Sequence, residues 1–124
     1  MAKPKVVTVL SQKGGAGKST LTMQLAGGLV RRGRRVAIVD LDPQETASRW
    51  AQAAAATAPF PAAVTRLEDA AALRQTIRAA GRDADVILLD CPPSIEHPAT
   101  LASLHEADVA LVPVVPSPAD LWST

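Results

Sequence analysis

The sequence has little cysteine and few aromatic side chains. Its one cysteine, Cys91, has no partner for an intramolecular disulfide, which fits a protein of the reducing cytosol. Two tryptophans, one phenylalanine and no tyrosine supply few large rings, so we expect an aliphatic, alanine-rich core. The apolar run at residues 6–10 is too short for a signal peptide, and no run approaches the ~18 apolar residues of a membrane span.

An excess of charge of one sign is also missing. Thirteen Lys and Arg against 12 Asp and Glu give a net charge of +1, which makes no argument for nucleic acid or a membrane surface. The chain does contain one basic cluster, formed by Arg31, Arg32, Arg34 and Arg35. We interpret this cluster as the solvated end of a helix rather than as a DNA-binding patch. The 124 residues are enough for one globular domain.

The most informative stretch is rich in glycine. Residues 13–20 read KGGAGKST and directly follow the apolar run at 6–10, an order that predicts a strand, a phosphate-binding loop and a helix. Glycines let backbone N–H groups approach a phosphate, and the helix turns its positive end to the same place. The predicted nucleotide-binding residues here are Gly14, Gly15, Ala16, Gly17, Lys18, Ser19 and Thr20.

Charged and hydroxyl side chains complete the predicted loop. Lys18 brings a positive charge to the β- and γ-phosphates, the Ser19 hydroxyl can ligate Mg²⁺, and Thr20 can add a hydroxyl near the α-phosphate. The stretch departs from the pattern G-x-x-x-x-G-K-[ST], because Gln12 stands at the first glycine position and Lys13 is an additional lysine. A glycine-rich turn that binds no ligand is the alternative interpretation.

Apolar runs alternate with helical patterns along the chain. Strands are predicted at residues 6–10, 36–39, 62–65, 86–89 and 109–112, and helices at 18–32, 45–56, 67–80 and 100–105. This alternation predicts a three-layer α/β/α fold with a mostly parallel sheet, in one domain spanning residues 1–124. A further helix is predicted from residue 119, so we expect the C-terminal part of the fold to lie outside this sequence.

The packing faces of three helices are predicted from their apolar residues. The first helix repeats Leu21, Leu25 and Leu29, and the small residues 26–28 are expected to let it approach the sheet closely. In the second, Trp50 is expected to pack in the core, and the alternative is that it covers the nucleotide or an interface. The third has an apolar face formed by Leu67, Ala70, Leu73 and Ile77.

Acidic side chains stand where two predicted strands end. Asp40 and Asp42 follow the second strand, and Asp90 follows the fourth. Ligands of parallel sheets bind beyond the carboxyl ends of the strands, so we expect these carboxylates to meet the phosphate loop. A magnesium nucleotide needs a carboxylate for the metal's water shell and an acceptor that orients the attacking water. A turn residue at a strand end is the alternative interpretation of Asp90.

Four segments in this order resemble one family. They read KGGAGKST (13–20), VDLDPQ (39–44), LLDCPPS (88–94) and PVVPSPADLW (113–122). In these segments the chain resembles the ParA/MinD group of deviant Walker-A P-loop ATPases, and most closely the short ParA-like partition ATPases. Five residues precede the first predicted strand, so we expect no N-terminal DNA-binding extension.

The resemblance implies a role for each motif residue. Lys13 matches the signature lysine that reaches the partner subunit's phosphates, and Lys18 matches the Walker-A lysine. Asp42 matches the aspartate that positions the hydrolytic water. The metal residues implied are Ser19, Asp40 and Asp90, where Asp40 supports the metal's water shell or the loop lysine. The segment from Pro113 to Asp120 matches one near the base, and Asp120 is implied to contact adenine.

The same resemblance implies a function. ATP and Mg²⁺ bring two copies together as a homodimer, which binds nucleoid DNA nonspecifically, and a ParB-like or cargo-adaptor protein triggers slow hydrolysis to ADP. The cargo is a plasmid, a chromosome region or a protein assembly, and the protein is expected in the cytoplasm on the nucleoid. Open alternatives are a MinD-like membrane-associated positioning ATPase, a small-molecule ligase or iron–sulfur reductase component, and a domain that only binds nucleotide.

Three polar side chains have simpler interpretations. Cys91 is expected to be a small buried thiol, because no second cysteine or nearby histidine is available to make a reactive or metal site. His97 and His105 are expected to be isolated and exposed.

Overall fold

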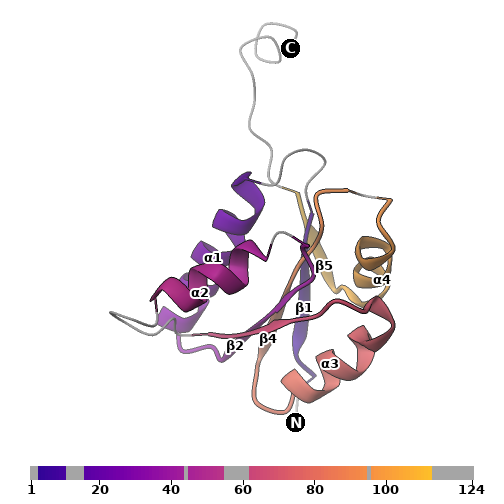
Figure 1. Cartoon of the computed structure of the whole chain (residues 1–124). Helices are drawn as coiled ribbons and strands as arrows, with labels where there is room; N and C mark the ends of the chain where they lie inside the picture. The colour runs from indigo at the N-terminus through magenta and orange to yellow at the C-terminus, as the bar shows by residue number, and fades with distance from the viewer. Residues whose placement is uncertain (1–2, 11–15, 44, 55–61, 95, 113–124) are drawn as a thin grey trace, which may run out of the picture.

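Five strands pair into one parallel sheet in the computed structural model, which describes residues 3–10, 16–43, 45–54, 62–94 and 96–112 (Figure 1). The side chains of residues 16–20, 46 and 54 lie outside that description. The strand order is β3-β2-β4-β1-β5. The strands are β1 (Lys5–Val9), β2 (Val36–Asp40), β3 (Ala63–Arg66), β4 (Val86–Asp90) and β5 (Val109–Leu111).

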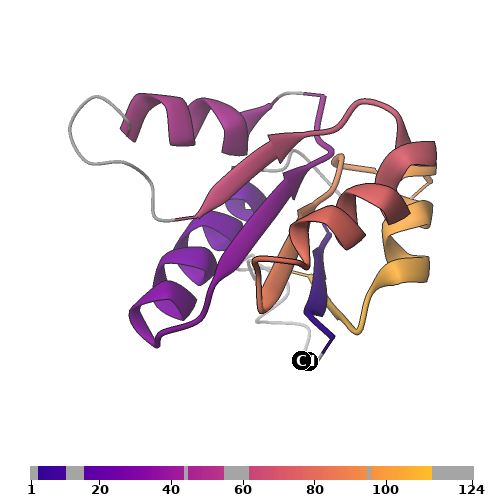
Figure 2. The same ribbon diagram turned by 90° about the horizontal axis from the view of Figure 1, so that it is seen from below.

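Helices cover both faces of the sheet (Figure 2). One face carries α1 (Ala16–Arg31) and α2 (Thr46–Ala54), and the other carries the short 3-10 helix η1 (Ala70–Ala72), α3 (Leu73–Ala80) and α4 (Pro98–Glu106). The predicted three-layer α/β/α fold with a parallel sheet is therefore confirmed. No helix in the described part of the chain is long and apolar enough to cross a bilayer.

The strands β2 and β4 are apolar on both faces up to their final aspartates, as expected for strands buried between helix layers. Alternate residues feed two separate cores. The α1/α2 side contains Met23, Ala26, Val36, Ile38, Ala47, Ala62 and Leu88. The α3/α4 side includes Ala37, Val39, Leu73, Ile77, Ile87, Leu89 and Ala99. Among the residues that the structure describes, no aromatic side chain belongs to either cluster, as the prediction of an aliphatic core requires.

The predicted helix at 67–80 is shorter and starts later. Asp69 ends an extended segment and caps η1, because its Oδ1 accepts a hydrogen bond of 2.9 Å from the backbone N–H of Ala71. The α-helix then begins at Leu73. The predicted apolar face is confirmed, since Leu73 and Ile77 are buried and the earlier Leu67 and Ala70 pack against the same cluster.

The predicted packing of α1 is partly wrong. Among its described side chains, Thr22, Met23 and Ala26 are buried, whereas Leu21, Leu25 and Leu29 are half-buried. The helix therefore turns Met23 and Ala26, rather than its leucines, into the core on this side of the sheet. A Cβ added at Gly27 or Gly28 would meet nothing within 4 Å, so these glycines do not mediate close packing.

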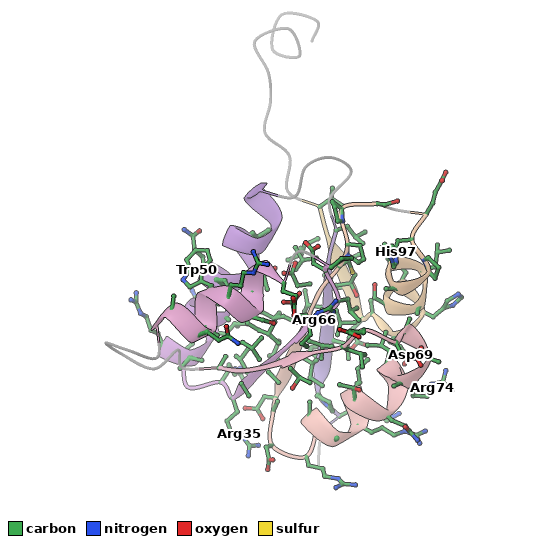
Figure 3. All side chains as sticks on the ribbon, in the orientation of Figure 1. Arg35, Trp50, Arg66, Asp69, Arg74 and His97 are labelled. Carbon is green, nitrogen blue, oxygen red and sulfur yellow. The ribbon has the colours of Figure 1, made fainter. Side chains whose placement is uncertain are left out.

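The expectation that Trp50 packs in the core is also wrong. Its side chain, labelled beside α2 in Figure 3, is 41% exposed. The helix α2 contacts β2, β3 and α1, and the small Ala47 is the residue of α2 that joins the core cluster on this side of the sheet.

An ion pair joins the loops that lead into β2 and β4, at the amino ends of the strands. Arg35 Nη2 lies 3.1 Å from Asp85 Oδ1, and the backbone N–H of Arg35 donates a 2.9 Å hydrogen bond to Asp85 Oδ2. These hydrogen bonds, first the one from the Arg35 side chain, hold the pKa of Asp85 below its ordinary value. The arginines at the end of α1 are exposed, as the solvated-helix-end interpretation predicted.

The strand β5 lies at the edge of the sheet. Its described pairing is with β1 alone, from Val7↔Val109 to Val9↔Leu111. Val109 and Val112 are 46% and 49% exposed there. An exposed valine, Val109, therefore stands on this edge strand, and Val112 directly follows it.

Candidate nucleotide-binding site

The strand order makes a binding crevice at the carboxyl ends of β1 and β4. After β1 the chain crosses over β4 to form β2, and after β4 it crosses over β1 to form β5. The two connections therefore leave neighbouring strands in opposite directions, which opens the usual ligand crevice of such sheets. The predicted phosphate loop falls in the first of these connections, although Lys13, Gly14 and Gly15 lie outside the described residues.

The amino end of α1 meets this crevice. The helix begins at Ala16, so the backbone of Gly17, Lys18, Ser19 and Thr20 forms its first turns. The helix contacts β2 and β4, and Figure 1 shows it beginning near the carboxyl ends of the strands. The first N–H groups of any helix have no partner within the helix, and together with the positive dipole end they suit a phosphate. The side chains of these five residues lie outside the described part.

Two of the predicted carboxylates are direct neighbours. Asp40 pairs with Asp90 in the register of β2 and β4, and Asp90 pairs with Val9 of β1. Two residues earlier on the same strands, Ile38 and Leu88 pack on the α1/α2 side. Because side chains alternate along a strand, Asp40 and Asp90 project to that side as well. The sheet thus turns both carboxylates toward the face on which α1 begins.

All three predicted carboxylates are buried. Asp40 and Asp90 are 0% exposed, and Asp42 is 3% exposed. Acidic side chains are almost never fully buried unless they have partners, and like charges on adjoining strands repel. A cation bound beside them offsets that repulsion. The burial therefore fits a site that receives positive charge.

Asp40 also organises the loop that follows β2. Its Oδ2 accepts hydrogen bonds from the backbone N–H and the hydroxyl of Ser48, at 3.1 and 2.7 Å, and its Oδ1 accepts one of 3.1 Å from the N–H of Asp42. A carboxylate at the amino end of α2 is also favoured by the helix dipole. Asp40 therefore fixes both the turn at Asp42 and the start of α2.

The turn before α2 is held in an unusual conformation. Glu45 has φ of 55°, the left-handed region that residues other than glycine rarely adopt. Its backbone N–H donates to Asp42 O at 2.9 Å, and its carboxylate lies 3.4 Å from Arg66 Nε. Arg66 Nη1 in turn donates to the carbonyl of Asp40 at 2.9 Å. Arg66, near the centre of Figure 3, thus joins the ends of β2 and β3 to this turn.

The segment after β4 is held by short polar contacts. Thr100 donates from Oγ1 to the carbonyl of Ser94 at 2.7 Å, and His97 caps α4 because its Nδ1 accepts from the N–H of Ala99 at 3.1 Å. Cys91 is fully buried, with Sγ 3.0 Å from Ser103 Oγ. The prediction of a small buried thiol is confirmed, and His97 is exposed as expected but has a capping role that was not predicted.

Sequence reasoning missed Ser48 and Arg66. Arg66 had a usable signal, because it is a charged residue directly after the strand predicted at 62–65. The structure places it in register with Asp40. Ser48 had none, since it is eight residues from Asp40 and belongs to no motif. Pro113 and Asp120, predicted to lie near the base, fall outside the described residues.

The donor set fits a magnesium ion that keeps most of its water. Among the described side chains, no three His, Cys, Asp or Glu residues form a group that could hold a metal. Mg²⁺ is usually bound through one or two carboxylates together with waters and substrate phosphates rather than by an all-protein cage. Asp90 at the end of β4, with Ser19 at the start of α1, could supply that kind of site.

Comparisons with known proteins agree with this geometry. Residues 7–110 match the family model of the CobQ/CobB/MinD/ParA nucleotide binding domain. The chain is 37% identical to the maintenance of carboxysome distribution protein A of Halothiobacillus neapolitanus, over 100% of this chain and 57% of that protein. It is 35% identical to the chromosome-partitioning ATPase Soj of Thermus thermophilus, over 91% of this chain and 55% of that protein.

A solved structure has the same fold over most of this chain. The cobyrinic acid a,c-diamide synthase of Mycobacterium smegmatis, with bound ATP analog and magnesium, superposes with a TM-score of 0.69 and 26% identity, covering 90% of this chain and 58% of that one. The chain thus spans little more than half the length of these relatives. Since the matched region runs from β1 to β5 and contains the crevice with its three buried carboxylates, this chain belongs to the CobQ/CobB/MinD/ParA nucleotide-binding domain family.

Proposed function

We propose that this chain is the nucleotide-binding part of a ParA-like positioning ATPase that uses ATP and Mg²⁺. The observation that carries the proposal is the register pairing of Asp40 with Asp90 on the face where α1 begins. That pairing assembles buried acid and a helix amino end at one place, as a magnesium nucleotide requires. The named relatives that distribute carboxysomes or partition chromosomes support the choice of positioning as the purpose.

Each site residue has one task in this proposal. The backbone from Gly14 to Thr20 binds the phosphates, and Lys18 neutralises their charge. Ser19 and Asp90 hold the metal ion and its water, while the bound ion would neutralise charge that develops on the phosphates. Asp42 orients the attacking water, and Asp40 keeps Asp42 in place through the 3.1 Å hydrogen bond to its N–H. Pro113 and Asp120 contact the base.

The proposal extends to partners of the whole protein. Lys13 crosses to the phosphates of a second copy, so ATP brings two copies together as a homodimer. Charge supplied in trans to a transferring phosphoryl group is worth on the order of 10³–10⁵ in rate in other nucleotide hydrolases. The dimer binds nucleoid DNA nonspecifically in the cytoplasm, and a ParB-like or cargo-adaptor protein stimulates hydrolysis.

Nucleotide binding is tested by titrating this chain with a fluorescent ATP analogue, with Mg²⁺ or with EDTA. We expect saturable binding that weakens at least tenfold in EDTA and in Lys18→Ala, because a charge-assisted contact is worth about 1.5–3 kcal/mol. Lys5→Ala is the matched control, since Lys5 is an exposed lysine at the opposite end of β1. Equal binding by all three proteins would contradict the proposed site.

The hydrolytic role is tested with Asp42→Ala. We expect it to bind ATP and to remain dimeric on size-exclusion chromatography with ATP, whereas the unmodified protein returns to monomer as ATP is consumed. ADP should leave both monomeric. An Asp42→Ala protein that hydrolyses ATP at the normal rate would remove the proposed role of Asp42.

A small-molecule ligase is the second candidate. The superposition on the cobyrinic acid a,c-diamide synthase of Mycobacterium smegmatis favours it. A ligase consumes ATP only when its acid substrate is present, whereas a positioning ATPase is stimulated by DNA and a partner protein. Phosphate release with DNA alone, with partner alone and with both therefore separates the two functions.

A further inference from the structure

A cavity lies near the amino ends of the strands, at the opposite end of the sheet from the nucleotide crevice. It has a volume of about 600 Å³, a size typical of ligand pockets. Its walls come from the start of β1, from α3 and the turn after it, and from the segment between α4 and β5. We call it the amino-edge pocket, and its lining includes Lys3, Pro4, Val6 and Ile77.

Four cations surround this pocket. Arg74, Arg78 and Arg82 stand four residues apart along α3 and past its end, and Lys3 lines the pocket from the segment before β1. Residues four apart on a helix lie on one side, with a rise of about 6 Å between them. Arg74 is paired, since its Nε donates to Glu106 Oε1 at 2.9 Å. Within the described part of the chain, the side chains of Lys3, Arg78 and Arg82 have no hydrogen bond or ion pair.

The two acids of the pocket do not neutralise these cations. Glu106 is engaged by Arg74, and Asp108 Oδ2 accepts a 2.8 Å hydrogen bond from the backbone N–H of Val6. Asp108 thereby ties the end of α4 to β1. Three positive charges without a partner thus face a cavity whose acidic groups are already occupied.

The floor of the pocket is apolar. Val6 and Ile77 are buried beneath it, with 6% and 8% of their surface exposed. Pro4 is packed against Gly81, where an added Cβ would come within 2.9 Å of Pro4 Cγ. A glycine at this position lets the segment before β1 lie directly on the end of α3. The pocket is therefore built from close contacts between distant parts of the sequence.

We propose that the amino-edge pocket binds an acidic peptide segment of a partner protein, one that carries carboxylates at alternate positions and an apolar anchor between them. Alternate side chains of an extended peptide are about 6.6 Å apart on one face, close to the rise of about 6 Å between Arg74 and Arg78 on α3, and Arg82 follows in the turn after the helix. The anchor covers Val6 and Ile77. Glu106 and Asp108 on the wall disfavour nucleic acid, because protein surfaces that bind DNA are strongly positive and polar throughout.

A simpler role accounts for only part of these observations. Arginines near the end of a helix favour its dipole, which explains Arg78 and Arg82 as residues of α3. It does not explain Lys3, which belongs to another segment, or the apolar floor between the charges. The proposal goes beyond the proposed ATPase function and does not depend on it, because the pocket shares no residue with the nucleotide crevice.

The test is fluorescence anisotropy at low ionic strength with a labelled ten-residue peptide that alternates Glu with small residues and has one central Leu. We expect saturable binding that weakens about tenfold in the double variant Arg78→Gln/Arg82→Gln, and similarly when the Glu residues of the peptide become Gln. Replacing the central Leu by Ser should also weaken binding. The matched control is Arg31→Gln/Arg32→Gln, which removes two exposed arginines from the end of α1 and should change the affinity less than twofold.

Two results would overturn the proposal. The first is no binding of the Glu peptide, or equal binding by the Arg78→Gln/Arg82→Gln protein and the unmodified protein. The second is tighter binding of a single-stranded oligonucleotide of the same length, lost in the same double variant, which would make this a nucleic-acid face. Circular dichroism of both double variants confirms that the fold is intact, which is expected because all four arginines are exposed.

Discussion

The carboxyl ends of the strands (the carboxyl edge) and their amino ends (the amino edge) differ in whether charged side chains are buried or exposed. At the carboxyl edge, Asp40 and Asp90 are fully buried and point toward the amino end of α1. At the amino edge, charged groups stay in solvent, and the side chains of Arg35 and Arg74 are 66% and 69% exposed. In Figure 3 both of these arginines lie toward the lower end of the molecule, where β1 begins. Buried carboxylates at one end of the strands and exposed arginines at the other are thus separated by the length of a strand.

The contrast predicts the largest stability effect at Asp40. We expect Asp40→Ala to lower the free energy of unfolding by about 3 kcal/mol, because it leaves the buried N–H of Asp42 and the N–H and hydroxyl of Ser48 without their acceptor. Urea denaturation measures it. Asp83→Ala, at the exposed amino edge, should change stability by less than about 0.5 kcal/mol. A stabilised Asp40→Ala would show that repulsion from Asp90 outweighs these hydrogen bonds.

At the amino edge, we expect stability to depend on side-chain volume rather than on charge. Gly81→Ala is expected to cost about 1–2 kcal/mol, because its Cβ would lie 2.9 Å from Pro4 Cγ and 3.2 Å from the Ile77 carbonyl oxygen. Gly28→Ala, at an exposed helix position with nothing within 4 Å, should stabilise by about 1 kcal/mol. Thermal unfolding of both variants, and of Gly81→Ala combined with Pro4→Ala, tests whether Pro4 is the obstacle.

The carboxyl edge also stores backbone strain at Glu45. Glycine adopts φ of 55° without the cost of roughly 1–2 kcal/mol that a side chain adds there. Glu45→Gly loses the ion pair with Arg66, but at 3.4 Å and with 45% of the Glu45 side chain exposed this pair is worth less than about 1 kcal/mol. We therefore expect a gain of about 0.5–1 kcal/mol in chemical denaturation. Glu45→Ala keeps the strain and loses the pair, so a gain there would contradict the explanation.

The smallest effect is expected from the ion pair of Arg35 and Asp85. The folded state lowers the pKa of Asp85, so its contribution to stability is present above the ordinary pKa of about 3.9 and is lost as the pH falls through the lowered value. The stability difference between Asp85→Asn and the unmodified protein should therefore be visible at neutral pH and vanish in acid. Urea denaturation across this range measures it, and a difference that grows in acid would give the wrong sign.

Residues that end strands made much of the fold predictable from the sequence. Pro43 and Pro92 follow strands that end on Asp40 and Asp90, and these endings are where the structure ends β2 and β4. The parallel topology followed from the alternation of strands and helices, and it placed both aspartates at one edge before any register was known. Strong signals close in sequence were therefore enough for the frame of the site.

Features that depend on distant contacts could not be predicted. The hydrogen bonds from Ser48 to Asp40 arise because the chain turns back on itself over eight residues, and the left-handed Glu45 has no glycine or asparagine to announce it. Trp50 is 41% exposed, whereas the small Ala47 of the same helix is fully buried. The amino-edge pocket joins Lys3, Arg78 and Asp108, which share no motif and meet only in the folded chain.

The outer side of β5 has a practical consequence. Some of its N–H and C=O groups bond to β1 and the others face away from it, and in the described part of the chain no further strand pairs with those. An uncovered strand edge that carries exposed valines can pair with the same edge of another molecule. Preparations of this chain should therefore lose material to aggregation as concentration rises, and a lysine at Val109 or Val112 is the substitution that would keep it in solution.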